Sequence, residues 1–421
     1  MLSMKNVRAS AWSKALVVAC CAATVGGCVS KGAATKSELK LQILNPSNEV
    51  RQEVVTVDLP ASIPSQLEYL KQGVYQADGA WVEGVDKDAD GVLDQVIVKT
   101  VLQPNETKEI GLNQSNATRV VSAKRTQAEI SVKTGGTWEG RKYVGGEFEN
   151  ISHLSVPAEH TDHSYYIRYE GPGWENEQIG YRFYLDWRNA MDIFGKKVDT
   201  LVLQAVGQDG FDSYHEPAPW GMDVLKAGKS LGVGSIGQYI DSTVEHFQST
   251  DSVTCEIALN GDLSSIIRTN YFGWKTSTNA TDLESTLRID AGDRAVEHSV
   301  QLSKEVSGFC TGLVKHPKGE KLESIVGANG WAYIATYGEQ SLAGDGLGLA
   351  ILYRVNDVEY VKEGDYDHLV VFKPTTKKFS YYLLGAWEQE KAGIKTKEEF
   401  SDYLKEKVNR LNHPVSANLV Y

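Results

Sequence analysis

The sequence lacks the short motifs that mark the best-known catalytic sites. It has no nucleophile elbow, no phosphate-binding loop, no HExxH motif and no dinucleotide-binding fingerprint. It has only five cysteines and no CxxC pair, which excludes the familiar cysteine-based zinc sites. A strong alternation of strands and helices is also absent, which argues against a doubly wound parallel sheet. Any activity therefore has to be sought in less common groupings of residues.

Positive charge is in short supply as well. The 43 lysines and arginines are outnumbered by 55 aspartates and glutamates, which gives a net charge of −12. Proteins that bind nucleic acid need a basic face, so this balance argues against nucleic acid as a partner. It does not exclude an anionic ligand, because a local basic pocket can lie on an acidic protein.

Residues 1–27 predict a bacterial secretion signal. A basic start precedes an apolar stretch, 15–25, that is too short to span a membrane. The segment Val-Gly-Gly-Cys at 25–28 resembles a lipobox, which predicts Cys28 as the lipidated first residue of the mature chain. The alternative is an ordinary cleaved signal. In the lipoprotein prediction, residues 28–37 are a tether between the lipid and the folded part. The valine after the cysteine favours a lipid anchor in the outer membrane, on the periplasmic side, by resemblance to other lipoproteins.

Two cysteines remain for the folded part. Cys20 and Cys21 are expected to leave with the signal, so that Cys255 and Cys310 stay. In an oxidising periplasm these two residues could form a disulfide. Two buried free thiols are the alternative, and the sequence does not decide between them.

The pattern of the mature chain predicts an all-β protein. Short runs rich in β-branched and aromatic residues are separated by Gly, Asn and Asp, which is typical of antiparallel strands. We expect strands in segments 94–102, 164–170, 179–187, 200–206, 347–353, 368–373 and 379–387. The architecture expected is a large antiparallel β-sandwich, of the supersandwich kind, with a small N-terminal β domain.

One helix is expected, near the C-terminus. Thr396 can cap it, Glu399 completes a capping box, and apolar residues then recur at helical spacing until His413 and Pro414 end it. The polar run 113–119 suggests the domain boundary. We therefore predict a small β domain at 38–117 and a large sandwich with the active-site cleft at 118–421.

An acidic segment follows the first strands. Asp86, Asp88, Asp90 and Asp94 lie at alternate or nearby positions around a glycine, which resembles the start of a calcium loop. It is not an EF-hand, because Ile97 stands where the bidentate glutamate would be and a strand follows. A shorter calcium loop and a plain acidic turn, whose carboxylates bond the backbone, are both open.

Charged and aromatic side chains are most concentrated between Gly171 and Ser230. At strand spacing, Tyr181, Phe183, Leu185 and Trp187 point toward the core, and Arg182, Tyr184, Asp186 and Arg188 point the other way. A solvated face with cross-strand ion pairs is one explanation. A cleft for a sugar acid is the other. The cleft is favoured because a second segment rich in charged and aromatic side chains follows. This segment contains His215, Trp220, Asp223, Lys226 and Lys229.

A third group is made of histidines. His153, His160 and His163 lie close in sequence, which makes a metal site conceivable. Their spacing, however, fits no familiar ligand pattern.

Several of these segments resemble a known family. They are GWENEQIGYRFYLDWRNAMDIFGKK, WGMDVLKAGKSLGVGSIG, GLVKHP, YGEQSLAGDGLGLAILY and YYLLGAWEQE, in this order. They resemble a family labelled as a domain of unknown function and associated with bacterial polysaccharide-utilisation loci. We associate it with an oligosaccharide dehydratase acting on ulvan, a sulfated algal polysaccharide. The N-terminal segments resemble the family too, so the likeness covers nearly the whole mature chain.

This resemblance implies a carbon–oxygen lyase that removes water from the non-reducing-end uronic acid of an anionic oligosaccharide. Such an elimination needs a cation for the carboxylate, a base for the C5 proton and an acid for the departing oxygen. No cofactor is required, although calcium is possible. The alternatives are a polysaccharide or oligosaccharide lyase, a glycoside hydrolase, and a glycan-binding lipoprotein without activity.

Residue type and spacing suggest the roles. We expect Arg182 and Arg188 to hold the carboxylate, His215 to act as base and Tyr184 as acid. Among the substrate-binding residues, Trp220 would stack on a sugar ring and Lys226 and Lys229 would face anionic groups. Asp186 and Asp223 would orient the other side chains.

Overall fold

The structure, a computed structural model, describes residues 39–121, 124–210, 213–322, 324 and 330–421. The expected signal at 1–27, the lipidation at Cys28 and the tether at 28–37 lie outside these residues and stay predictions. In the part that is described, no helix is long and apolar enough to cross a bilayer. Residues 38–421 form one compact unit, and antiparallel sheets make up most of it, as the sequence predicts.

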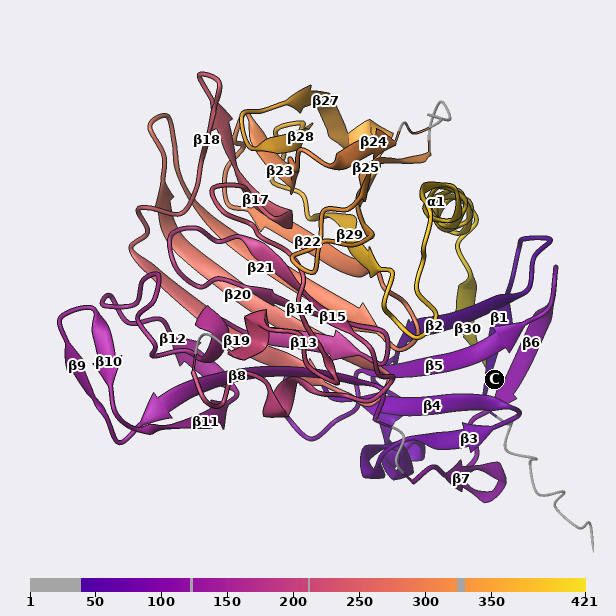
Figure 1. The fold of residues 1–421 in the computed structure, drawn as a ribbon. Coiled ribbons are helices and arrows are strands. Elements are labelled where there is room, and N and C mark those ends of the chain that lie inside the picture. The colour runs from indigo at the N-terminus through magenta and orange to yellow at the C-terminus, as the bar shows by residue number, and fades with distance from the viewer. Residues whose placement is uncertain (1–38, 122–123, 211–212, 323, 325–329) are drawn as a thin grey trace, which may run out of the picture. The chain divides into compact units, whose positions relative to one another are not determined.

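The body of this unit is a sandwich of antiparallel strands (Figure 1). The largest sheet has, in order, β12 (His153–Ser155), β19 (Ser252–Asn260), β20 (Ser264–Lys275), β21 (Ala280–Asp290), β22 (Val296–Leu302), β29 (Phe379–Trp387), β26 (Leu347–Arg354), β25 (Trp331–Gly338) and β24 (Gly319–Leu322). Apolar side chains from this sheet and from two facing sheets meet in one core.

The facing layer consists of two sheets and a small hairpin. The first sheet has, in order, β11 (Glu147–Ile151), β8 (Thr126–Thr134), β13 (Gly173–Asn176), β14 (Ile179–Phe183), β15 (Met191–Lys196) and β16 (Gly221–Asp223). The second has β18 (Thr243–Glu245), β17 (Val233–Ile240), β23 (Phe309–Val314), β28 (Asp367–Phe372) and β27 (Val358–Glu363), and the hairpin joins β9 (Thr137–Glu139) to β10 (Lys142–Val144).

The N-terminal part contributes two further sheets. One has β2 (Arg51–Asp58), β5 (Gln95–Leu102), β4 (Ala80–Val85), β3 (Tyr75–Ala77) and β7 (Thr118–Arg119), and the other has β30 (Ser416–Val420), β1 (Lys40–Leu44) and β6 (Thr107–Gly111). The sequence placed the C-terminal residues with the large sandwich, whereas β30 pairs with β1 in the structure. The domain boundary after residue 117 stays a prediction.

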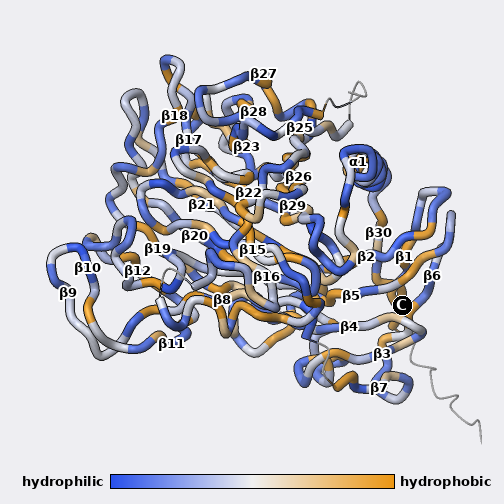
Figure 2. The backbone as a smooth tube through the Cα atoms, viewed as in Figure 1, coloured by the Kyte–Doolittle hydropathy of each residue, from blue (hydrophilic) through white to orange (hydrophobic). Residues whose placement is uncertain are grey.

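The C-terminal helix is confirmed. α1 spans Lys397–Asn412, and the Thr396 side chain accepts a hydrogen bond from the Glu399 amide. The Glu399 carboxylate in turn accepts from the Lys395 amide at 2.8 Å. Phe400 and Leu404 are buried against β25 and β26, and Figure 2 shows most of the rest of α1 as hydrophilic. The helix therefore packs on the sandwich, as expected.

Short 3₁₀ turns complete the fold. They are η1 (Pro64–Gln66), η2 (Glu68–Gln72), η3 (Gln114–Asn116), η4 (Arg168–Glu170), η5 (Leu203–Ala205), η6 (Ser213–His215) and η7 (Val355–Asp357). Two of them replace expected strands: segments 164–170 and 200–206 contain η4 and η5 instead. In the first segment the left-handed φ of Tyr165, Tyr169 and Glu170 is incompatible with a strand.

The two cysteines of the folded part are free thiols in the structure, since Cys255 and Cys310 are both buried and unpaired.

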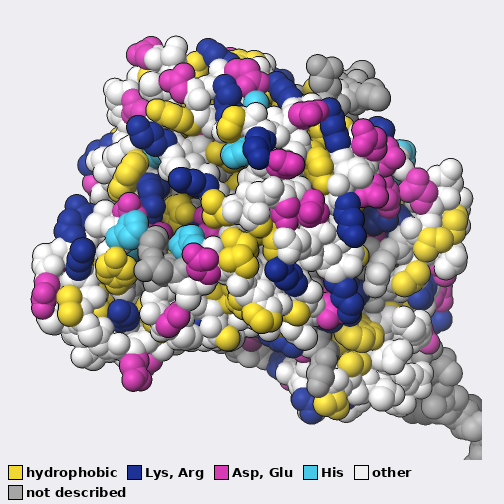
Figure 3. Space-filling model, viewed as in Figure 1, with side chains coloured by type: hydrophobic (Ala, Val, Ile, Leu, Met, Phe, Trp, Pro, Cys, Tyr) yellow, Lys and Arg dark blue, Asp and Glu magenta, His cyan; other side chains and the backbone are white. Residues whose placement is uncertain are grey.

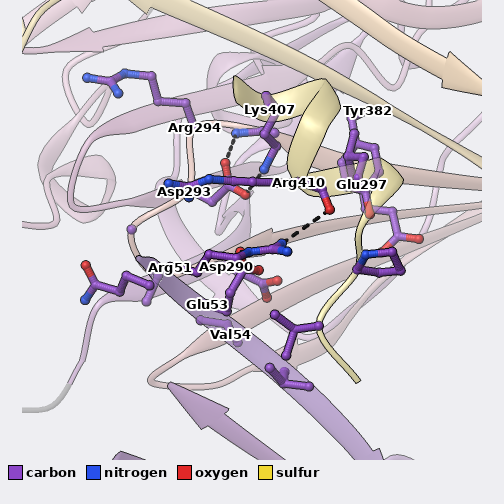
Figure 4. Close-up of a pocket in the computed structure, with 18 of the residues that line it drawn as sticks. Arg51, Glu53, Val54, Asp290, Asp293, Arg294, Glu297, Tyr382, Lys407 and Arg410 are labelled. Atoms are coloured by element: carbon purple, nitrogen blue, oxygen red, sulfur yellow. Dashed lines mark hydrogen bonds and ion pairs between the residues drawn. The ribbon is translucent and has the colours of Figure 1, made fainter. Parts of the chain in front are cut away.

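A hollow of about 340 Å³ lies where β2, the turn after β21 and α1 meet (Figure 4). Several of its charges are paired with one another, as in the ion pair between Lys407 and Asp293. Arg51 is only 3% exposed. It forms an ion pair with Glu53 at 2.7 Å and donates to the backbone carbonyls of Arg410 and His413 at the end of α1. This arginine therefore ties β2 to the C-terminal end of the helix, where carbonyls lack helical partners.

We expect Arg51→Ala to lower the free energy of unfolding by about 2–4 kcal/mol, because it leaves buried acceptors and Glu53 without their donor. Urea unfolding followed by circular dichroism measures this change. Lys395→Ala, at an exposed position before α1, is the control and should change stability little. A loss no larger than that of the control would contradict this role.

Candidate active site

Three strands bring opposite charges together on the outer face of the six-stranded sheet. Arg182 of β14 lies directly across from Asp192 of β15, and Asp223 lies on β16, beside β15. The side chains of β14 alternate between the two faces as the sequence predicts, because Tyr181 and Phe183 belong to the sandwich core. The outer face is nevertheless not open, since the arginine and both carboxylates are at most 2% exposed.

One guanidinium nitrogen connects this group. Arg182 Nη2 donates to Asp223 Oδ2 at 2.6 Å and to Asp192 Oδ2 at 3.0 Å. It also lies 3.3 Å from the Tyr184 hydroxyl, and Arg182 Nη1 lies 3.0 Å from the Tyr214 hydroxyl. The prediction that Arg182 faces an open cleft is therefore wrong, because its guanidinium is buried and already neutralised by two carboxylates. Its catalytic role stays a prediction.

His215 reaches the same network from the loop side. It ends η6, and its Nε2 lies 3.4 Å from Asp223 Oδ2. Its side chain is 32% exposed, and the ring packs against Tyr214 with centroids 4.5 Å apart. Burial, and secondly the charge of Asp192, raise the pKa of Asp223 well above its usual range. The imidazole thus has a carboxyl partner on one side and solvent access.

Tyr184 lies between the two arginines. It follows the end of β14, and its hydroxyl donates to Asp192 Oδ2 at 2.7 Å. The guanidinium carbons of Arg188 and Arg182 lie 4.1 and 5.0 Å from its ring centroid. Burial raises the pKa of Tyr184 well above 10. Its hydroxyl therefore keeps its proton at neutral pH and is a hydrogen donor.

Arg188 is the more accessible of the two arginines, with a side chain that is 15% exposed. It forms a two-pronged pair with Asp186, at 2.5 and 3.1 Å to Oδ2. It also contacts Glu170 and Asp162, each at 3.0 Å. Burial raises the pKa of Asp162. Because Asp162 is the most exposed of these three carboxylates, at 41% of its side chain, it is the partner that an incoming anion can replace most easily.

The backbone around this group is unusually strained. Left-handed φ angles occur at His163 (55°), Tyr165 (60°), Tyr169 (39°), Glu170 (70°) and Asn189 (47°). Each such conformation in a non-glycine residue costs about 1 kcal/mol or more and persists only where neighbouring contacts determine it. Their concentration here is typical of a functional site.

The three histidines for which a metal site was conceivable do not group together in the part of the chain that the structure describes. His160 is buried with Nδ1 2.7 Å from the Ser164 hydroxyl, and burial lowers its pKa. His153 is exposed on β12, 3.9 Å from Glu256. Among the described residues, His163 instead groups with Asp162 and Glu170, whose ligand atoms lie within 4.8 Å of one another. Both of these carboxylates are bound to Arg188, so the group fits an ion-pair cluster better than a metal centre.

The acidic segment is the turn between β4 and β5. Asp86, Asp88 and Asp94 place oxygen atoms within 4.8 Å of one another, and Asp90 is outside this group. Backbone amides donate to each carboxylate, for example from Gly91 to Asp86 at 2.8 Å. This is the acidic turn that the sequence allowed, and calcium binding there stays a prediction.

The predicted substrate-binding residues differ in accessibility. Trp220 is half-buried against Phe194, with ring centroids 6.0 Å apart. Lys226 and Lys229 are exposed. Figure 3 shows histidine side chains with Lys and Arg side chains above them, over the region where β12, β19 and β20 run.

Sequence reasoning missed Asp192, Tyr214, Glu170 and Asp162. Asp192 carried a signal, since a carboxylate inside the apolar run AMDIF has to be paired. The other three became recognisable only through their contacts with the two arginines.

Some known proteins are similar to this chain in sequence or in structure. An uncharacterised protein, P7, of Formosa agariphila is 22% identical over 359 residues, which cover 80% of each chain. An α-mannosidase from Enterococcus faecalis V583 aligns over 92% of this chain and 46% of its own, with 12% identity and a TM-score of 0.41. A glycosyl hydrolase family 38 protein from Enterococcus faecalis aligns over 92% of this chain and 48% of its own, with 11% identity and a TM-score of 0.40. The chain thus spans about half the length of these two structures.

The sequence also matches a family over residues 43–417. That range extends from β1 into β30 and includes every residue of the site described above. The chain therefore belongs to the family described as a domain of unknown function, DUF4861.

Proposed function

We propose that this protein is a carbohydrate-active lyase that removes water from the non-reducing-end uronic acid of ulvan-type oligosaccharides. One observation carries the proposal: a partly exposed imidazole and a protonated phenol belong to a single buried network. His215 lies 3.4 Å from Asp223, Asp223 accepts from Arg182, and the same guanidinium nitrogen lies 3.3 Å from the Tyr184 hydroxyl. A base and an acid near each other are what the elimination requires.

The proposed step balances without a cofactor. His215 takes the C5 proton, and the electrons of that bond form the C4–C5 double bond. The C4–O bond breaks, and the departing hydroxyl takes a proton from Tyr184 and leaves as water. Proton transfer from His215 to Tyr184, directly or through solvent, restores the starting state. The products are water and an unsaturated uronate.

The substrate carboxylate needs a cation as negative charge grows at C5. Arg188 is the better candidate, because Arg182 is buried. In the proposed complex the uronate replaces Asp162 at Arg188 Nη1, while Asp186 keeps the guanidinium in place. Exchanging one carboxylate for another preserves the charge balance of the cluster.

The two rival enzymatic functions differ in the groups that they need. A glycoside hydrolase needs two carboxyl groups flanking the scissile bond. The candidates from the sequence, Asp186 and Asp223, have side chains only 0% and 1% exposed. Both carboxylates are also held in ion pairs, Asp186 with Arg188 and Asp223 with Arg182, which disfavours their role in hydrolysis. A lyase that cleaves the chain would use the same base and acid as the dehydratase and differs in what departs from C4.

The test is incubation of the purified protein with ulvan-derived oligosaccharides, followed by mass spectrometry and by the ultraviolet absorbance of an unsaturated uronate. Loss of one water without shortening, together with new absorbance, supports the proposal. Shorter products with absorbance indicate a chain-cleaving lyase, and shorter products without it indicate a hydrolase. No change across a broad panel of uronates indicates a binding protein. Full turnover by both His215→Ala and Tyr184→Phe would refute the assigned roles.

A further inference from the structure

Trp187 lies where a core residue was expected. The strand pattern placed it with Tyr181 and Phe183, yet it is 44% exposed, whereas Phe183 is 2% exposed. The reason is that β14 ends at Phe183 and the chain then turns. A tryptophan this exposed presents a large, rigid ring whose apolar face a ligand can cover.

The turn that carries Trp187 is held firmly. Asn189 adopts a left-handed φ of 47°, and its amide donates to the Asp186 carbonyl at 3.1 Å. The Asn189 side chain accepts from the buried Tyr271 hydroxyl at 2.5 Å and donates to Ser235 at 3.2 Å. The Trp187 carbonyl also accepts from the Phe247 amide at 3.1 Å. The ring is thus presented by a backbone that is already ordered, which lowers the entropy lost on binding.

A hollow of about 220 Å³ opens beside this ring. Trp187, Tyr239 and Tyr366 supply aromatic surface, and Lys229 supplies positive charge, while Asp365 and Asp367 are the carboxylates of the lining. A cavity of roughly 150 Å³ accommodates one six-membered ring, so this hollow has room for one sugar residue. Trp187 also lines a second hollow of about 370 Å³, together with Asp186 and His160.

The first hollow adjoins the candidate active site at Arg188. That residue lines the hollow and lies 4.1 Å from the Tyr184 ring. Lys229 lies over the Tyr366 ring at 5.7 Å, and no ion pair of Lys229 is seen among the described residues. Its charge is therefore available to an anionic ligand.

We propose that this hollow binds the sugar residue next to the reacting uronic acid, stacked on Trp187, with Lys229 facing an anionic substituent of that residue. The site then recognises an anionic oligosaccharide of at least two residues rather than a free uronic acid. This inference rests on the proposed function, and it moves the aromatic platform from Trp220 to Trp187.

The experiment compares Trp187→Ala with the wild type on a uronic acid methyl glycoside and on a sulfated ulvan tetrasaccharide. Binding is measured by calorimetry on a His215→Ala background, so that turnover does not interfere. We expect Trp187→Ala to weaken tetrasaccharide binding roughly tenfold or more and to leave binding of the monosaccharide within about twofold. Trp187→Phe should recover part of the loss.

Two further variants make the test specific. Lys229→Ala should weaken binding of the sulfated tetrasaccharide more than that of its desulfated form, whereas Lys377→Ala, exposed outside the hollow, should change neither. Phe272→Ala is matched to Trp187 in exposure, at 43%, and should also change neither.

The possible results separate the inference from the proposed function. An equal loss for both ligands, no loss, or no tetrasaccharide binding by the parent would overturn the inference. Length-dependent binding that requires Trp187, without any turnover by the wild type, would support the inference and overturn the lyase proposal.

Discussion

Replacing His215 with alanine is expected to lower kcat for elimination by roughly 10²- to 10⁴-fold, the usual contribution of a general base. The imidazole is the partly exposed group of the buried network, and Asp223 fixes its orientation from 3.4 Å away. Stability should change little, because the side chain is 32% exposed. Initial rates from the ultraviolet absorbance of the product, with unfolding curves for each variant, measure both effects.

Three comparisons decide whether His215 acts as a base or only holds its surroundings. His153→Ala removes an exposed histidine on β12 and should leave kcat unchanged. Added imidazole should restore part of the activity of His215→Ala, which it would not do if the residue were only structural. His215→Gln keeps a hydrogen-bonding side chain without the basicity and should remain as slow as the alanine variant. A glutamine variant with near-normal kcat would contradict the role of base.

Replacing Arg182 with alanine is expected to lower the free energy of unfolding by about 3–5 kcal/mol. The change leaves Asp192 and Asp223 buried without the cation that neutralises both. Burial and the charge of Asp192 already raise the pKa of Asp223 in the intact protein, and removal of Arg182 raises it further. Urea unfolding at several pH values measures the deficit.

The loss of unfolding free energy in Arg182→Ala is expected to depend on pH. A carboxyl whose folded pKa exceeds its unfolded value binds more protons in the folded state, so its contribution to stability falls as pH rises between the two values. The deficit of Arg182→Ala should therefore shrink on acidification, as the Asp223 carboxyl takes up a proton. Adding Asp223→Asn to the variant should remove most of the pH dependence. A deficit that grows on acidification would contradict the explanation.

Local patterns predicted much of the fold. The strands β5, β26, β28 and β29 and the capped helix α1 follow from periodicity and capping residues that act over a few positions. Segments 164–170 and 200–206 failed for a physical reason. Their aromatic and β-branched residues favour a strand, but tertiary contacts override that local preference. The first segment contains left-handed residues, and in the second the Val202 and Leu203 amides donate to the buried Glu175 carboxylate.

The candidate site was predictable in composition but not in arrangement. Arg182, Tyr184, Arg188, His215 and Asp223 were recognised from residue type, and the structure brings them into one network. Asp192 and Tyr214 complete that network because β15 and η6 lie beside β14 and β16, which is a matter of strand pairing between separate segments.

By itself the sequence determined that this chain forms antiparallel strands, carries a capped C-terminal helix and concentrates charge and aromatic rings between residues 171 and 230. These properties depend on neighbours along the chain. Only the tertiary structure decided that Arg182 is buried, that Trp187 is exposed and that the C-terminal strand pairs with β1. Burial and pairing depend on residues far apart in sequence, and they decide whether a charged side chain is neutralised within the protein or left for a ligand.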